Sequence, residues 1–523
     1  MLIFVVLHVL MIGTAIGLIY WYARFDRAGG AMRDVWAGAL LGNLALLAAV
    51  SYFNVSIYPK PALVVHSHDI FHYYVGAKYS PELGYLDLYP ATVLADTENG
   101  EGRIRLRRLR DMESYEIVAA AGVVDAADEY RGRFSAERWE EFKSDVDYFH
   151  AKIADATGWG KVVRDKGYNA TPVWNMVAYY LTNGLSTRNP VGIPLLVSLD
   201  IVFLVAMFWL ISQAFGRRAA LFAVVFFGTV FMMAPGHISL AFLRLDWLAL
   251  LVMATCLLKM GRYGTAGGFV AYAGMVRIFP LIFAFGLGAK CLWDLLSTRR
   301  LDRRRLRFLL AFAIVAAALF ALSAAHDGGL DGWRAFSTKI QLHDEEMSFA
   351  RVGFKNLFLM MYGQSGQAWD DYKTVKQQQF RGMQGLWWTL QAAILAVSFF
   401  AVRRLEDYET LPFSFVLVYF LAAPTFYYHV MLVVPLLLFL PKLHERRRAH
   451  GAALLFAVSI VGYAAYTFSY ARFANLAWSR PRAWPEVDLT ITFVLACLLF
   501  VVSLYVAGMA LGGLRTTPRP PPR

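Results

Sequence analysis

Long apolar runs constrain this chain more than any other feature of its sequence. A helix of about 20 residues crosses about 30 Å of hydrocarbon, and fewer residues suffice where a helix is broken. By this measure about 13 spans are expected, at residues 2–22, 35–57, 191–213, 219–235, 246–260, 265–276, 278–297, 308–325, 385–402, 411–425, 430–441, 451–470 and 489–511. Of the 523 residues, 58% are hydrophobic and only 17% are charged. We therefore expect an all-α polytopic membrane protein.

Basic residues cluster in alternate loops, which predicts the orientation of the chain. The clusters are Arg217-Arg218, Lys259-Arg262, Arg299 to Arg307, Arg403-Arg404, Lys442 to Arg448 and the tail from Arg515. Such clusters mark cytoplasmic loops. The intervening loops 58–190, 236–245, 326–384, 426–429 and 471–488 then lie outside the plasma (inner) membrane. The net charge of +13 is spread over short loops, which argues against a nucleic-acid partner.

The chain divides into alternating membrane and polar segments. We expect two N-terminal transmembrane helices (1–57), a large outer loop (58–190), a transmembrane bundle (191–325), a second outer loop (326–384), a C-terminal transmembrane bundle (385–511) and a Pro/Arg-rich cytoplasmic tail (512–523). The first outer loop is too long for a plain connection. Ser135 is expected to cap an amphipathic helix with an apolar stripe from Trp139 to Ile153. That stripe could lie on the membrane, but its modestly basic polar face favours packing on a hairpin at Arg103 to Val124.

The segment from Val64 to Tyr79 places an acid, three histidines, a lysine and a row of tyrosines where a span meets water. Isolated cations follow on the same predicted side. An acid and several cations at a membrane boundary suit transfer from a lipid-linked phosphate, since arginine matches phosphate oxygens and one base can activate the acceptor hydroxyl. We expect Asp69 to be that base. The expected phosphate ligands are Arg277, Arg244, Arg351, His237 and His429, and the expected sugar or acceptor ligands are His72, Tyr73, Tyr74, Lys78, His343 and Asn356.

Each of these residues also has a structural interpretation. Asp69 could cap a helix or join a salt bridge, and Arg244 could pair with Asp246 at a helix entrance. Arg277 could be a snorkelling helix end, although an arginine between apolar stretches is costly.

No metal or other cofactor is firmly implied. The run His343-Asp344-Glu345-Glu346 is typical of a solvated face, although it could help to hold a divalent ion. His66 and His68 are interpreted as local structure, because the downstream sequence shows no evident acidic or cysteine partner for them.

Two short patterns resemble a known family. These are Asp69 followed by Tyr73-Tyr74, Ala77, Gly84 and Leu88-Tyr89, and the element Arg277-Ile278-Phe279-Pro280. The first resembles the first-loop signature of glycosyltransferase family 87 in the GT-C superfamily, and the second resembles that family's basic-residue-x-Phe-Pro element, with Arg where Lys is common. The resemblance implies a GT-C-like fold, a polyprenyl-phosphate-sugar donor, Asp69 as base and inversion at the sugar carbon. The first loop is longer than the family leads us to expect between about residues 90 and 170.

We therefore expect a hexosyl- or pentosyltransferase, mannosyl or arabinosyl by resemblance, that acts on a glycan or glycolipid acceptor among membrane lipids. Two alternatives stay open. A transporter or flippase for a lipid-linked or anionic solute would use the same cations near mid-membrane on broken helices. A membrane assembly factor would use the first loop to bind a partner, and its cations would not converge on Asp69.

Overall fold

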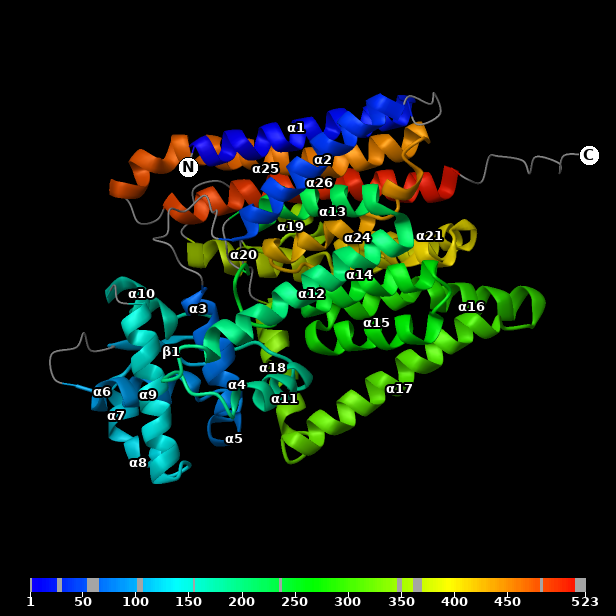
Figure 1. Cartoon of the computed structure of the whole chain (residues 1–523). Coiled ribbons are helices and arrows are strands. Elements are labelled where there is room, and N and C mark those ends of the chain that lie inside the picture. Colours follow the sequence, from blue (N-terminus) through cyan, green and yellow to red (C-terminus); the bar gives the residue numbers. More distant parts are fainter. Residues whose placement is uncertain are drawn as a thin grey trace, which may run out of the picture.

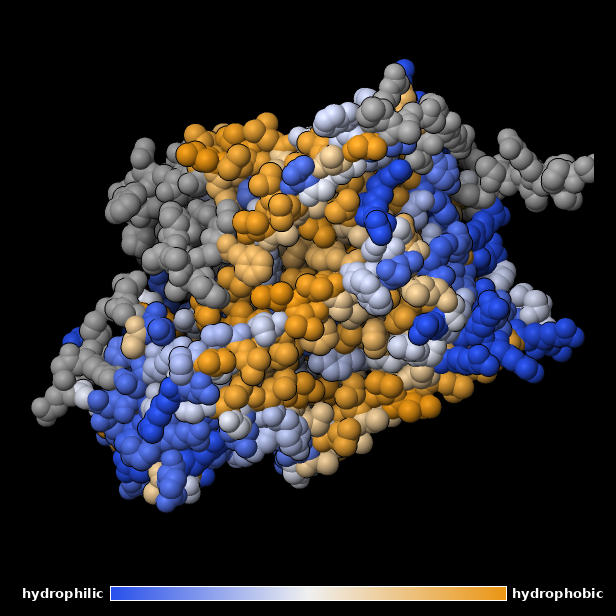
Figure 2. Space-filling view, in the orientation of Figure 1, coloured by the Kyte–Doolittle hydropathy of each residue, from blue (hydrophilic) through white to orange (hydrophobic). Residues whose placement is uncertain are grey.

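A computed structural model of the chain describes residues 2–25, 31–53, 65–100, 107–153, 156–234, 238–345, 350–360, 369–479 and 483–512. The described chain is mainly helical, with a bundle of long helices and a smaller polar domain at one end of it (Figure 1). We use the name polar domain for the described part of residues 65–190. The space-filling view shows a hydrophobic band with hydrophilic zones at both ends (Figure 2).

The bundle contains helices of very different lengths. In chain order they are α1 (Leu2–Phe25), α2 (Ala31–Tyr52), α12 (Gly192–Phe215), α13 (Arg217–Thr229), η2 (Phe231–Met233), α14 (Asp246–Lys259), α15 (Tyr263–Arg277), η3 (Phe279–Ala284), α16 (Phe285–Thr298), α17 (Arg303–His326), α21 (Gln384–Ala401), η4 (Val402–Arg404), η5 (Asp407–Glu409), α22 (Thr410–Phe413), α23 (Phe415–Leu421), η6 (Phe426–Leu432), α24 (Val433–Leu436), η7 (Leu440–Lys442), α25 (Arg446–Ser479) and α26 (Ala483–Gly512). The segment between α17 and α21 contributes α18 (Asp331–Glu345), α19 (Phe354–Met360) and α20 (Trp369–Gly382).

Among the described residues, eight helical segments are long and apolar enough to cross a membrane, which makes the chain a polytopic membrane protein. They are Leu2–Phe25, Asp34–Tyr52, Gly192–Phe215, Phe279–Thr298, Arg303–His326, Gln384–Arg404, Arg446–Ser469 and Thr490–Gly512. The expectation of about 13 spans is therefore too high. The other expected spans fall on shorter helices, such as α14 with 14 residues, which at 1.5 Å per residue is about 21 Å long. The apolar composition of these segments correctly predicts that they are buried, but a helix can be buried inside the bundle without crossing the whole membrane.

Small residues let the bundle helices approach closely. A Cβ atom added to Gly267 on α15 would lie 2.2 Å from the carbonyl oxygen of Phe308 on α17. A Cβ atom on Gly228 of α13 would lie 2.0 Å from the carbonyl oxygen of Ala48 on α2. Helix pairs in membranes commonly pack through such small residues. Any larger side chain at either glycine would push the two backbones apart.

The polar domain is built from short helices and one hairpin. Its elements are α3 (Ser67–Ile70), the π-helix η1 (Phe71–Val75), α4 (Gly76–Lys78), α5 (Ser80–Leu83), α6 (Leu88–Glu98), β1 (Arg108–Arg110), β2 (Ile117–Ala119), α7 (Ala121–Asp125), α8 (Ala127–Arg131), α9 (Ala136–Lys152), α10 (Ala156–Val162) and α11 (Pro172–Thr182). The two strands pair antiparallel, with Leu109 opposite Val118. Thr171 caps α11 and also donates a hydrogen bond to the carbonyl of Met275 in the bundle (2.8 Å), which ties the domain to α15.

The amphipathic helix expected after Ser135 is confirmed as α9. The Ser135 hydroxyl accepts a hydrogen bond from the backbone N–H of Arg138 over 3.2 Å, which caps the helix. The apolar stripe is buried, and its Phe149 ring lies 5.7 Å from that of Phe71 on η1. The stripe packs mainly on α6 and on the helix that carries Asp69, so the expectation that it packs on the hairpin is wrong.

Candidate functional site

Asp69 lies on α3, at the start of a helix that passes through the π-helical turn η1. Such turns occur often at functional sites. His66 caps this helix, since its Nδ1 accepts from the backbone N–H of Asp69 over 3.1 Å. The backbone N–H of His66 in turn donates to the carbonyl of Leu240 over 3.0 Å, which docks the helix on the loop before α14. The helix-cap interpretation of Asp69 is thus wrong, whereas the salt-bridge interpretation is confirmed, because its carboxylate lies within ion-pair distance of Arg244.

The Asp69 carboxylate faces Arg244. Its Oδ2 lies 3.4 Å from Arg244 Nε, which is longer than a good hydrogen bond. Asp69 Oδ2 and the Nε and Nη1 atoms of Arg244 are buried without a hydrogen-bond partner among the described residues. Burial raises the pKa of Asp69, while the charges of Arg244, His68 and Arg277 act in the opposite direction. The Asp69 carboxylate and the Arg244 guanidinium therefore attract each other electrostatically but do not complete each other's hydrogen bonding.

The loop before α14 holds Arg244 in place. The backbone N–H groups of Arg244 and Leu245 donate to the Asp200 carboxylate over 2.9 and 3.1 Å. Leu243 has a positive φ of 46°, which is unusual for a leucine and marks strain at this turn. Asp246 accepts a hydrogen bond from the hydroxyl of Tyr272 over 3.0 Å. The Arg244 side chain thus pairs with Asp69 and not with the expected alternative partner, Asp246.

Arg277 ends α15 and turns into the same region. The α-helix ends immediately after it, because Ile278 has a φ of 59° and Pro280 follows. Arg277 Nη2 donates to the carbonyl of Leu243 over 3.1 Å, while its Nε is buried without a partner in the described chain. Its side chain is buried, so it does not snorkel towards an interface. A strained turn therefore aims a second guanidinium at the loop that carries the first.

Aromatic rings form a platform between the two arginines. The Arg244 guanidinium carbon lies 4.4 Å from the centre of the Tyr73 ring, and that of Arg277 lies 5.8 Å from the same ring and 5.7 Å from Trp174. Tyr427 on η6 lies 5.8 Å from Arg244. Cations over aromatic faces are stabilised by the ring quadrupole. Burial raises the pKa of Tyr73 to about 12, so its hydroxyl stays neutral.

Two of the expected sugar ligands, Tyr74 and Lys78, lie in a different network. The Lys78 ammonium donates to the carboxylate of Asp145 over 2.7 Å and lies 2.8 Å from that of Glu141. Tyr74 shares this network through a 3.1 Å hydrogen bond from Lys78 and donates to the carbonyl of Leu185 over 2.6 Å. These contacts tie the Asp69 helix to α9, which is a structural task.

The remaining expected residues lie on several elements. His72 is buried on η1, and burial lowers its pKa to about 4. Arg351 forms a backbone bridge with Thr425, and Asn356 donates to the carbonyl of Arg351 over 2.8 Å. His429 is buried on η6, two residues after Tyr427. His343 lies on α18 and its side chain is outside what the structure describes, as is the whole of His237.

Three contributors to the site were not identified from the sequence. Trp174 is buried against Tyr73, with ring centres 4.9 Å apart. Tyr427 lies far along the chain and carried no signal of its own. Asp200 did carry one, because a carboxylate inside an apolar span is costly and so marks a function or a structural partner.

No protein-family model and no curated protein matches this chain. The chemistry of the site must therefore be argued from its geometry. Two buried guanidinium groups share an aromatic platform beside the partly buried carboxylate of Asp69, and several of their polar atoms lack partners among the residues described. Buried polar atoms are nearly always hydrogen-bonded in folded proteins. An anionic ligand that also offers a proton donor to Asp69 would satisfy this set.

Proposed function

We propose that this protein is a membrane glycosyltransferase that moves a sugar from a polyprenyl phosphate to a hydroxyl of a glycan or glycolipid. The observation that carries the proposal is the convergence of Arg244 and Arg277 on the Tyr73 platform beside Asp69. Guanidinium groups bind phosphate oxygens through paired N–H donors. A site of this kind within a membrane protein suits a ligand with an anionic head and a lipid tail. The resemblance to glycosyltransferase family 87 supports a GT-C-like fold.

The proposed reaction is a single displacement at the anomeric carbon. The acceptor oxygen forms a bond to that carbon as the bond to the phosphate oxygen breaks, and the phosphate leaves with the electron pair. Asp69 takes the proton of the acceptor hydroxyl, and Arg244 and Arg277 stabilise the negative charge of the departing phosphate. Attack opposite the leaving group inverts the sugar carbon. Arg351, His237 and His429 remain further candidates for the phosphate, and His72, Tyr73, His343 and Asn356 for the sugar or acceptor.

The proposed location of this reaction is the outer face of the plasma (inner) membrane. The Arg299 to Arg307 cluster lies around the junction of α16 and α17, at the end of the bundle away from the polar domain (Figure 1), and basic clusters favour the cytoplasmic side. A lipid-linked donor would keep its tail in the bilayer while its phosphate reaches the arginines. The polar domain would then lie where a glycan acceptor is available.

One observation favours a second candidate function, transport of a lipid-linked or anionic solute. Arg277 lies at a break between α15 and η3, and broken helices with exposed ends form the binding sites of many transporters. A transporter needs no base, however, and gives no role to Asp69. The two candidates therefore differ in what loss of that carboxylate does.

The test uses the purified full chain with a panel of labelled polyprenyl-phosphate hexoses and pentoses and membrane glycolipid acceptors. We expect Asp69→Asn to lower transfer at least about 100-fold, the contribution of a general base. The same variant should keep the donor-induced rise in melting temperature, because a ligand that binds only the folded state stabilises it. The matched control is Asp125→Asn on the exposed surface of α7, which should leave transfer unchanged.

Undiminished transfer by Asp69→Asn would exclude the base role. Passage of labelled donor across sealed vesicles, with no transfer product from the wild-type chain, would instead favour the transporter. Donor stabilisation lost in Arg244→Gln and Arg277→Gln but kept in Asp69→Asn would separate the phosphate ligands from the base.

A further inference from the structure

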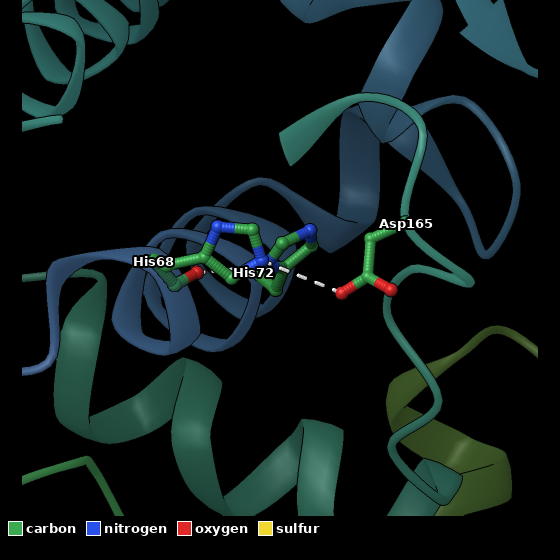
Figure 3. Close-up of side chains that lie close together, drawn as sticks. All are labelled: His68, His72 and Asp165. Atoms are coloured by element: carbon green, nitrogen blue, oxygen red, sulfur yellow. Dashed lines mark hydrogen bonds and ion pairs between the residues drawn. The ribbon is translucent and has the colours of Figure 1, made fainter. Parts of the chain in front are cut away.

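His68, His72 and Asp165 lie together on the polar domain, outside the arginine site (Figure 3). The two histidines are four residues apart along the helix of α3 and η1, so they share one face of it, and their ring centres are 5.1 Å apart. Asp165 lies in the loop after α10 and faces the two histidines, and its Oδ2 is 3.5 Å from His68 Nε2. One candidate ligand atom from each residue lies within 4.8 Å of the other two.

We propose that these three residues bind a divalent transition metal ion of the Zn²⁺ class. Imidazole nitrogens and carboxylate oxygens lie about 2.0–2.2 Å from zinc, so tetrahedral ligands are roughly 3.3–3.6 Å apart. The His68 to Asp165 distance already fits this range. Ca²⁺ and Mg²⁺ prefer all-oxygen sites, whereas two imidazoles with a carboxylate favour Zn²⁺ and its neighbours.

The surroundings of His72 are suited to metal binding. Its Nδ1 lies 2.8 Å from the carbonyl of His68 and its Nε2 lies 3.1 Å from the carbonyl of Val162. A neutral imidazole has only one N–H, so it cannot donate to both carbonyls. With the proton on Nδ1, the Nε2 atom of His72 and the carbonyl oxygen of Val162 are two hydrogen-bond acceptors that face each other. The Tyr89 hydroxyl, 2.9 Å from Nε2, is then the one donor beside them. A cation bound at Nε2 would replace the hydrogen bond from Tyr89 and could take Nε2 and the Val162 oxygen as ligands.

The other two ligands can adjust and remain accessible. The side chains of His68 and Asp165 are 37% and 53% exposed, which leaves room for the small rotations that close the set and a path for the ion. The backbone of the Asp165 loop is held firmly. Arg110 Nε donates to the carbonyls of Arg164 and Asp165, both over 3.1 Å, and its backbone N–H donates to Val163 over 2.8 Å. Outer contacts of this kind orient metal ligands.

The sequence concealed this site because the acid lies 97 residues after the first histidine. His68 was interpreted as local structure for want of an acidic partner, and the fold provides that partner in Asp165. The site is adjacent to Asp69 in the chain but uses none of the arginine donors. It therefore does not depend on the proposed transferase activity.

The test measures metal binding by the full chain after treatment with a chelator. Zn²⁺ alone is titrated by calorimetry and by the shift in melting temperature, and Co²⁺ alone by its visible absorption. We expect one ion per chain, stabilisation by Zn²⁺, and a loss of affinity of at least about tenfold in His68→Ala and in Asp165→Asn, since even outer partners of metal ligands are worth 10–100-fold. Both changed side chains are partly exposed, so the variants should fold.

The control is His444→Ala, an exposed histidine between η7 and α25, which should bind Zn²⁺ as the wild type does. If His68→Ala and Asp165→Asn bound Zn²⁺ as tightly as the wild type, the proposed site would be wrong. It would also be wrong if His444→Ala lost as much Zn²⁺ affinity as they do. Asp69→Asn is expected to keep Zn²⁺ binding even if it loses sugar transfer, which separates the fate of this proposal from that of the proposed function.

Discussion

Two buried charge clusters on the Asp69 helix differ in how completely their members are satisfied. In the first, the Lys78 ammonium contacts Asp145, Glu141 and the carbonyl of Leu185 within 2.8 Å. Asp145 also accepts from the hydroxyl of Tyr79 over 2.8 Å. In the second, Asp69 and Arg244 approach only to 3.4 Å.

The second cluster also leaves polar atoms unused. Arg244, Arg277 and Asp69 each have buried side-chain atoms without hydrogen-bond partners in the described part of the chain. A buried ion pair with complete hydrogen bonding holds a structure together, whereas underused buried charges destabilise the free protein. The Lys78 cluster is therefore a scaffold and the Asp69 cluster a binding site, although Lys78 and Asp69 are only nine residues apart in the chain. Equivalent substitutions in the two clusters should have different consequences.

The largest effect is expected for Lys78→Met. This change leaves the buried Asp145 without its cation, while Glu141 keeps its pair with Arg138. It should lower the free energy of unfolding by about 3–5 kcal/mol, as for other broken buried pairs. Thermal unfolding of the purified chain in detergent measures it. Lys152→Met, on the exposed end of α9, is the control, and an equal loss of melting temperature in the two variants would remove the distinction between the clusters.

A smaller effect on stability and a larger one on binding are expected for Arg277→Met. Arg277 forms no ion pair with the described residues and donates to backbone carbonyls, so its replacement breaks no buried ion pair and the melting temperature should fall less than in Lys78→Met. Affinity for a polyprenyl-phosphate donor should fall about 10–100-fold, because a hydrogen bond to a charged group is worth about 1.5–3 kcal/mol. Donor titrations followed by thermal shift measure both quantities.

The control for Arg277→Met is Arg334→Met, which removes an exposed arginine whose ion pair among the described residues is with Asp331, three residues before it. It should change neither quantity. If Arg277→Met destabilised the chain as Lys78→Met does while donor affinity stayed constant, Arg277 would belong to the scaffold.

The last prediction concerns Lys339 on α18, whose effect appears only as a slope of stability with pH and which extends the comparison to a third buried cation. Its ammonium donates to the carbonyl of Tyr168 over 2.7 Å and lies 5.0 Å from the centre of the Tyr85 ring. Burial lowers its pKa to about 7, against about 10.4 in the unfolded chain. Between these values the unfolded state binds the extra proton, so stability should rise with pH in this window, by up to about 1.4 kcal/mol per unit.

Lys339→Met should flatten this pH dependence. Melting temperatures between pH 7 and 9.5 measure the slope, and Lys161→Met, an exposed lysine of α10, should keep the wild-type slope. An unchanged slope in Lys339→Met would show that this ammonium stays protonated in the folded protein.

The sequence by itself determined the features that depend on neighbouring residues. Apolar runs specified a membrane protein, Ser135 and the stripe after it specified α9, and the mixture around Asp69 marked the segment that carries the site. Apolarity, helix caps and periodicity act within a few turns, and they can be read from a short window of sequence.

Only the tertiary structure decided which runs are long enough to span and which charges meet. Apolar composition cannot distinguish a crossing helix from a short buried one, so α14 was counted as a span. Lys78 and Arg244 are both cations near an acid, yet packing gives one a complete set of partners and leaves the other underused. Asp165 reaches His68 across 97 residues. These pairings depend on how helices pack, and helix packing is a property of the whole chain.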